Sequence, residues 1–404
     1  MRPSRALPLV VLATAALLIG ATAAQAEDAG PKLLFSYVGA FNGLAAGGLS
    51  KTATYVHAVA AGVQAPLGGP WIVTLQGAWT AGSNLSARAI GDVAGVQGPF
   101  NSGDGLWLYE LKATYATDAA TVQLGRVSTG DALPGVAGMN QFVNSAYSSN
   151  GGAITVNDPG RATTPASTWG AWGRIEAGSV ELRGGAFLSD PNRTTLRKHG
   201  ADFSFRPADG VLTFGEAVAP LSAGLKIGAG AYGDTARFQT FDGRAVRGSG
   251  GWYVWLERPA PDKPAPALSG FAMVQGAPRD DRNLQPLFLI VGLTWQGIDP
   301  GRPADALSVG FTSGQFSKAS PLRGRETTLE ANYRVTLSDH LTVRPDVQYV
   351  ISPGGRGGGP NALVLGVQIE SSGRKRTGPA RSTATRPAAR RAELCREPAC
   401  MHRQ

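Results

Sequence analysis

Between Pro70 and Ile369 the sequence repeats one pattern: a segment of about ten residues alternates apolar and polar, and the connection after it is alternately short and long. The segment from Thr327 to Leu337 is the clearest instance, because polar or charged residues occupy its even positions and mostly apolar residues its odd ones. An alternation with period two is typical of a β-strand and not of a helix. The repeated pattern therefore predicts a transmembrane, antiparallel, up-and-down β-barrel.

Aromatic residues occupy both ends of one such alternating face. Trp71 and Trp79 bracket Val73, Leu75 and Gly77 on a single parity. Eight residue steps cover roughly 27 Å of strand, or roughly 19 Å of bilayer at a 45° tilt, which would place the tryptophans near the two headgroup belts. A second face repeats this design with Trp107, Tyr109, Leu111, Ala113 and Tyr115. A soluble sandwich with one wetted face is the alternative, which alternation alone does not exclude.

The first 26 residues have the order of a secretory signal peptide. Arg2 and Arg5 supply the charged start, residues 7–19 form an apolar core, and residues 24–26 read Ala-Gln-Ala, a small-x-small cleavage site. After residue 26 no stretch approaches the length of apolar sequence, about 18 residues, that a membrane-spanning helix needs. A closed barrel is then the remaining way to cross lipid, because every backbone polar group must be paired there.

The excess positive charge of the chain lies outside its central part. The net charge of +9 includes two basic residues in the signal, and nine basic against two acidic residues in 373–404; residues 27–372 contain 27 of each. A neutral body argues against nucleic acid as a partner and against a dedicated ion channel. Both cysteines lie in the tail 371–404, whose Arg, Pro, Ala and Thr content predicts disorder. The four histidines are scattered, so neither a metal site nor a cofactor is expected.

Sixteen strands are predicted within a barrel domain over 27–370. Their expected ranges are 31–41, 53–64, 70–80, 106–116, 120–127, 167–176, 179–188, 210–218, 223–232, 251–258, 268–276, 286–296, 305–315, 326–337, 341–351 and 361–370. Four connections that follow odd-numbered strands are long, namely 81–105, 128–166, 189–209 and 233–250. The connection 128–166 is long enough to fold inward and narrow a channel, the alternative being a mobile surface loop.

The last third of the chain resembles the carbohydrate-selective outer-membrane porin family of the OprB type. Three blocks carry the resemblance: a Gly, Pro-Gly-Arg, Asp turn at 297–305, a Glu-Thr-x-Leu-Glu strand at 326–330, and the block Pro-Asp-x-Gln-Tyr at 345–349 followed by Pro-Gly-Gly at 353–355 and Ala-Leu-x-Leu-Gly at 362–366. Weaker similarity near Gly125-Arg126 and 141–145 extends it toward the N-terminus. The resemblance implies a sixteen-stranded barrel that passes sugars by facilitated diffusion across a bacterial outer membrane. We expect sugars as permeating solutes, and a monomer or homotrimer as the assembly.

Charged residues on the inward parity are the candidate sugar contacts. The predicted pore-lining residues are Glu110, Lys112, Arg126, Arg174, Glu176, Glu181, Arg183, Glu330, Arg334, Arg344 and Asp346. Arginine offers a fork of donors to vicinal hydroxyls and carboxylates accept from them, so mixed-sign pairs suit neutral polyols better than ions. The alternative is that these pairs only brace a wet wall.

Three other functions compete with a sugar pore. A general diffusion porin has the same strand pattern, and a soluble secreted carbohydrate-binding protein would share the β-rich composition. An enzyme is disfavoured because no serine-centred elbow or placed base is visible in the sequence.

Overall fold

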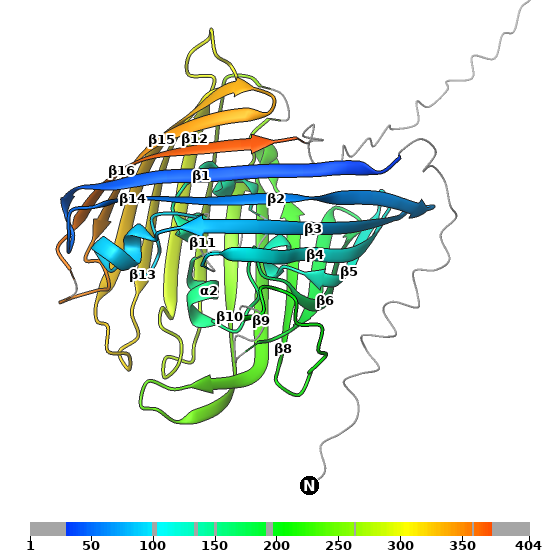
Figure 1. Cartoon of the computed structure of the whole chain (residues 1–404), viewed down its shortest axis with the longest axis horizontal. Coiled ribbons are helices and arrows are strands. Elements are labelled where there is room, and N and C mark those ends of the chain that lie inside the picture. Colours follow the sequence, from blue (N-terminus) through cyan, green and yellow to red (C-terminus); the bar gives the residue numbers. More distant parts are fainter. Residues whose placement is uncertain are drawn as a thin grey trace, which may run out of the picture.

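The computed structural model describes residues 30–98, 103–132, 136–148, 152–190, 197–261, 264–357 and 359–373. The predicted signal peptide 1–26 and nearly all of the predicted tail lie outside the described residues. Sixteen antiparallel strands form one closed barrel, in which each strand pairs with its neighbours in sequence and β1 pairs with β16 (Figure 1). The strands are β1 (Lys32–Gly47), β2 (Ala53–Gly68), β3 (Trp71–Gly82), β4 (Gly105–Ala116), β5 (Ala120–Val127), β6 (Thr168–Ala177), β7 (Val180–Leu188), β8 (Val211–Pro220), β9 (Lys226–Gln239), β10 (Ala245–Arg258), β11 (Ala267–Gly276), β12 (Leu287–Gln296), β13 (Ala306–Gln315), β14 (Arg325–Ser338), β15 (Leu341–Ile351) and β16 (Ala362–Ser372).

The alternation in sequence becomes an inner and an outer face of this wall. In β8 the even positions, such as Phe214 and Glu216, are buried, whereas Thr213, Gly215 and Ala217 are exposed. The outer face elsewhere carries exposed leucines and tryptophans, as lipid requires. The prediction of a sixteen-stranded all-β barrel is therefore confirmed.

The hairpin of β9 and β10 extends further than predicted, and the expected long connection 233–250 is wrong. β9 runs to Gln239 and β10 begins at Ala245, so that Ala245 pairs with Gln239 and Val246 with Phe238. Backbone pairing continues there without an apolar outer face, because this part of the hairpin is rich in Gly, Asp and Arg. A search for alternating hydrophobicity cannot find such a segment. β16 likewise runs two residues beyond its predicted end at 370.

The face predicted for Trp107 is also wrong. A bulge interrupts the β3–β4 pairing, since Gln76 lies opposite Glu110 but Gly77 lies opposite Leu108. One extra residue in β4 reverses the facing of everything beyond it. Trp107 therefore points inward, where it is 2% exposed and its Nε1 donates to Thr80 Oγ1 at 2.9 Å.

The described residues of segment 128–166 lie inside the ring of strands. They form helical turns at Thr129–Asp131, Ala137–Gln141 and Ser145–Tyr147, followed by the short helix α2 (Gly152–Asn157), seen within the barrel in Figure 1. Phe142 stacks on Tyr147 with ring centroids 4.2 Å apart. Both belong to a buried apolar cluster that includes inward-facing side chains of β7 to β12. One side of the interior is thus a packed core.

Residues 83–98, which belong to the connection between β3 and β4, also contact the inner wall. They contain one helical turn, Ser86–Ile90, whose residues pack with Leu44, Val350 and Val364. Among the described residues, no helix combines the length and apolar character needed to cross a membrane.

Candidate functional site

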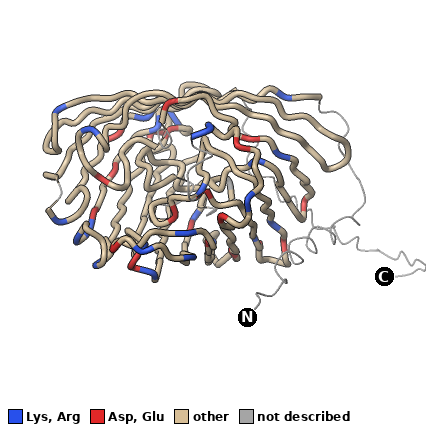
Figure 2. Tube along the Cα trace, turned by 60° about the horizontal axis from the view of Figure 1, so that its bottom comes forward, with Lys and Arg blue, Asp and Glu red and all other residues tan. Residues whose placement is uncertain are grey.

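Side chains on the inner face of β4, β6, β7 and β8 form a set of ion pairs, which we call the ion-pair wall. Its members are Glu110, Lys112, Arg174, Glu181, Arg183 and Glu216. Figure 2 shows basic and acidic positions interspersed around the barrel, without one side carrying a single sign.

Neighbouring members of the ion-pair wall bind one another. Lys112 Nζ lies 2.7 Å from Glu110 Oε1, and Arg174 Nη1 lies 2.9 Å from Glu181 Oε2. Arg183 bridges two carboxylates, because its Nε donates to Glu181 while its Nη1 lies 3.4 Å from Glu216 Oε2. The wall therefore contains an ion pair on β4 and a connected series of four charged groups across β6, β7 and β8, with donors and acceptors of both signs in each.

Several of these side chains keep part of their surface free. The Arg174 side chain is 38% exposed, and those of Arg183 and Glu181 are 18% and 14% exposed, whereas the Glu216 side chain is fully buried. Glu176, near the end of β6, is exposed and lies opposite Glu181 in the register. Guanidinium and carboxylate groups with free surface can still bind hydroxyls.

Glu330 and Arg334 of β14 bind segment 128–166, and we call these two residues the anchor wall. Glu330, only 3% exposed, accepts hydrogen bonds from the backbone N–H of Val143 at 2.8 Å and of Asn144 at 3.0 Å. Arg334 Nη1 donates to Gln141 Oε1 at 2.9 Å. The predicted inward residues thus hold segment 128–166 against the wall.

On β15, Arg344 and Asp346 are both 3% exposed. Arg344 Nη1 donates to Gln368 Oε1 at 2.7 Å and lies 3.1 Å from Glu370 Oε1. Asp346 accepts from Gln348 Nε2, which also donates to the carbonyl of Val96. Arg344 thus binds side chains of β16, while Gln348 links Asp346 to residues 83–98 of the connection between β3 and β4.

Two anchoring carboxylates are absent from the predicted set. Glu326 accepts from the backbone N–H of Val93, Ala94 and Gly354, and Glu257 accepts from the N–H of Gly138 at 2.7 Å. Both lie on predicted strands, as Glu216 does. Their inward parity was the signal that could have found them.

Arg126 does not lie with the other candidates, and its predicted position in the lumen is wrong. It shares the parity of Leu124, which is 43% exposed on the outer face, and it lies opposite Trp169. Its guanidinium donates to the carbonyls of Asp202 at 2.6 Å and Gly200 at 2.8 Å. The reason is that Arg126 lies near the C-terminal end of β5, where residues 200–202 of the connection between β7 and β8 cover the outer face of the wall.

In the described residues no group of three or more His, Cys, Asp or Glu is arranged to hold a metal ion.

A closed barrel with an apolar outer wall, mixed charges on the inner wall and a segment folded inside it defines a porin, a channel of the bacterial outer membrane. Residues 73–372 match the family model for carbohydrate-selective porins, the OprB family, and the chain belongs to this family. Family and fold point to a channel rather than an enzyme.

Known relatives agree with this assignment. Porin B of Pseudomonas aeruginosa is 26% identical over 145 residues, a match that covers 30% of this chain and 32% of that protein. The high-pH structure of Pseudomonas putida OprB has a TM-score of 0.76 at 23% identity, covering 85% of this chain and 94% of that one. Its low-pH structure has a TM-score of 0.53 at 18% identity, covering 85% and 92%. Because the match with Porin B spans about a third of that protein, the solute of this chain is a matter for proposal.

Proposed function

We propose that this porin passes monosaccharides and small oligosaccharides by facilitated diffusion, and that the ion-pair wall is the surface along which they move. The observation that carries the proposal is the partial exposure of Arg174, Glu181 and Arg183 on an inner wall of balanced charge. Segment 128–166 packs against inward-facing side chains of β7 to β12 and would narrow the path along the ion-pair wall.

The chemistry of the ion-pair wall suits a neutral solute with many hydroxyls. A guanidinium offers a planar fork of donors to vicinal hydroxyls, and a carboxylate beside it accepts from the same sugar. Because donors and acceptors already pair with each other, a sugar replaces existing hydrogen bonds and gains little net free energy. Weak binding at several successive positions favours flux over retention.

Liposome swelling with the refolded chain tests the proposal. Monosaccharides and disaccharides are compared with amino acids of similar size, in the same vesicles and at equal osmotic strength. We expect sugars to enter faster than size-matched amino acids. Rates that follow size alone would instead identify a general diffusion porin, and an absence of swelling would overturn the channel itself.

For the assembly we propose a monomer or a homotrimer in which every subunit contains a complete pore. The barrel closes within one chain through the β1–β16 pairing, so no second chain is needed to form the lumen. The molecular mass of the detergent-solubilised protein, from light scattering, decides between the two, and a dimer would contradict both.

A further inference from the structure

The outer wall contains an apolar groove that has no part in solute passage. Its volume is about 800 Å³, and Leu33, Val63, Leu75 and Leu106 line it. Ala61 and Gly77 lie opposite each other in the β2–β3 register and contribute little side chain, so they form a low strip between larger neighbours. Leu33 is 83% exposed and Leu106 is 72% exposed, which places the groove on the lipid-facing side.

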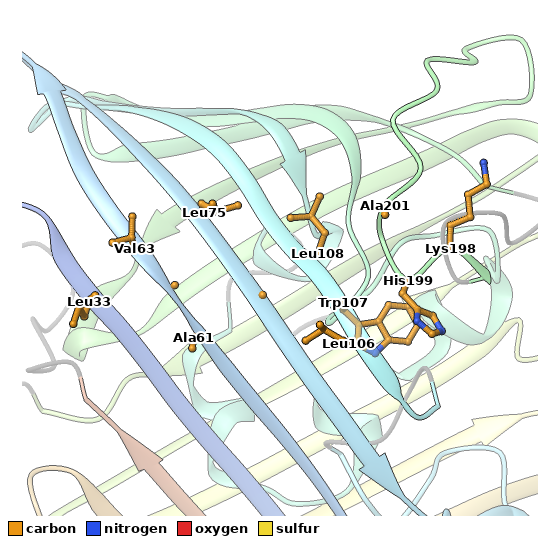
Figure 3. Close-up of a pocket in the computed structure, with 12 residues that line it drawn as sticks. Leu33, Ala61, Val63, Leu75, Leu106, Trp107, Leu108, Lys198, His199 and Ala201 are labelled. Carbon is orange, nitrogen blue, oxygen red and sulfur yellow. The ribbon is translucent and has the colours of Figure 1, made fainter.

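An external segment closes one end of this groove. The residues of β4 that precede Leu111 do not pair with β5. The backbone N–H of Leu108 donates instead to the carbonyl of His199 at 2.9 Å. Arg126 fixes the same segment through the carbonyls of Gly200 and Asp202. Figure 3 shows the apolar side chains of the strands leading toward Lys198 and His199 at this end.

The segment 197–206 carries a surplus of positive charge beside the groove. It contains Arg197, Lys198 and Arg206 against a single acid, Asp202. Lys198 Nζ lies 3.2 Å from Asp202 Oδ1, yet its side chain is 53% exposed, so its ammonium retains free surface. Phe205, 70% exposed, adds an apolar side chain to the same segment.

We propose that this groove binds one acyl chain of a phosphate-bearing lipid of the outer leaflet, and that Lys198 and its basic neighbours hold the phosphate. The segment belongs to the long connection after β7, which lies at the extracellular end as long connections of such barrels do. From β1 to β4 the groove crosses roughly 14 Å of wall at the usual strand spacing, enough for a large part of a fatty acyl chain.

Charge complementarity and shape select this occupant. A groove left empty in a bilayer forfeits dispersion contacts along its floor, and a flexible acyl chain restores them. A lysine close to an anionic lipid surface contributes about 1 kcal/mol to binding. A lipid without a phosphate would gain the dispersion contacts but not the contribution of the lysine, so the proposal predicts a preference for phosphate as well as for the groove.

Native mass spectrometry of the full chain in non-ionic detergent tests this, with lipid A and enzymatically dephosphorylated lipid A as probes. We expect one retained lipid A per chain, and about fivefold weaker retention without phosphate, the effect of one lysine. Gly77→Leu should abolish the retained lipid A by filling the groove. A Cβ at Gly77 would lie 3.5 Å from the carbonyl oxygen of Trp107, which is an ordinary contact, so the backbone tolerates the change.

Gly215→Leu is the control for Gly77→Leu, and Lys318→Glu is the control for Lys198→Glu. Gly215→Leu adds the same side chain to the outer face of β8, where a Cβ meets no atom of the described residues within 4 Å, and lipid A should remain bound. Lys198→Glu should lower retention of lipid A but not of the dephosphorylated form. Lys318→Glu reverses an exposed charge in another connection and should change neither.

Three results would overturn the proposal. Equal retention by the unaltered chain and by Gly77→Leu would mean that only annular lipid is bound. Equal retention of the two lipid A forms would remove the phosphate from the site. A bound second copy of the chain that is lost in Gly77→Leu would make the groove a subunit interface. Heat-modifiable mobility in gel electrophoresis verifies that each variant is folded. If Gly77→Leu does not fold, the retention of lipid A by Lys198→Glu tests the proposal, and unchanged retention by that variant overturns it.

Discussion

The charged side chains of the ion-pair wall, on β4, β6, β7 and β8, bind one another, whereas Glu330 and Arg334 on β14 bind segment 128–166 inside the barrel. In the ion-pair wall, Arg174 and Glu181 form a partly exposed pair. In the anchor wall, Glu330 is buried and accepts two backbone N–H groups of segment 128–166. Both sets arise from the same sequence feature, an alternating strand with charges of both signs.

The comparison teaches that the partner, not the residue type, decides what an inward charge does. An exposed pair contributes about 0–1 kcal/mol, since water competes for both groups. A buried carboxylate that accepts backbone N–H groups contributes about 1.5–3 kcal/mol per hydrogen bond. The anchor wall therefore sets the shape of the lumen, and the ion-pair wall leaves its groups available to a solute.

The largest effect is expected from Glu330→Ala. The change leaves the buried N–H groups of Val143 and Asn144 without their acceptor, at a cost of about 3 kcal/mol. Released from the wall, segment 128–166 should narrow the lumen less, so single-channel conductance should rise while the unfolding temperature falls. Glu330→Gln keeps one carbonyl acceptor, so its conductance and unfolding temperature should lie between those of the unaltered chain and of Glu330→Ala. Unaltered conductance and stability would remove the distinction between the two walls.

The pH dependence of stability tests how segment 128–166 is held near its C-terminal end, at Asp158. Burial, and the nearby Asp234 carboxylate, raise the pKa of Asp158 to about 8, although Arg161 opposes this. Unfolded, the carboxyl ionises near pH 4, so from about pH 4 to about pH 8 the folded state binds more protons. The segment should be most stable below this window and should loosen as pH rises through it.

Hydrogen exchange of residues 152–166, corrected for the intrinsic rate, measures this loosening between pH 5 and pH 9. Asp158→Asn should remove the pH dependence, because the amide does not ionise. Asp242→Asn alters a carboxylate in the β9–β10 turn and should leave the dependence in place. A slope that persists in Asp158→Asn would assign the effect to another group.

The barrel could be predicted from the sequence because lipid imposes a period of two on the outer face. Sixteen strands followed from that period and from the turn residues between them. The length of the β9–β10 hairpin could not be predicted, because its end carries no apolar outer face. Trp107 was placed on the wrong side because a bulge depends on pairing with β3, which local alternation does not encode.

The candidate site was predictable only in part, for a related reason. Parity placed Glu110, Arg183 and Glu330 on the inner wall, but it did not reveal which wall segment 128–166 would pack against. That choice depends on the buried cluster around Phe142 and Phe271, whose members come from distant parts of the chain. Whether the inward charges line the sugar path stays a prediction.

Arg183→Ala should have a smaller effect than Glu330→Ala and should act on both stability and transport. The change removes the cation beside the buried Glu216 carboxylate and one partner of Glu181, at a cost of about 2 kcal/mol. Arg183→Lys keeps the charge but not the planar fork. We therefore expect the lysine variant to retain most stability, in thermal unfolding, and still to lose discrimination between sugars and amino acids in liposome swelling. If the unaltered chain, Arg183→Ala and Arg183→Lys discriminate equally between sugars and amino acids, Arg183 has no sugar-binding role.

Arg174→Ala should have the smallest effect on stability and gives the clearest test of the ion-pair wall. Its side chain is 38% exposed and its pair with Glu181 is screened, so the loss of stability should be below about 1 kcal/mol. Sugar flux should nevertheless fall by about threefold, if a guanidinium there contributes one weak hydrogen-bonding position to the path. Lys318→Ala removes an exposed cation from a connection and should change neither quantity. A lower unfolding temperature with unchanged flux would make Arg174 a brace of the wall, and the two walls would then differ only in what they hold together.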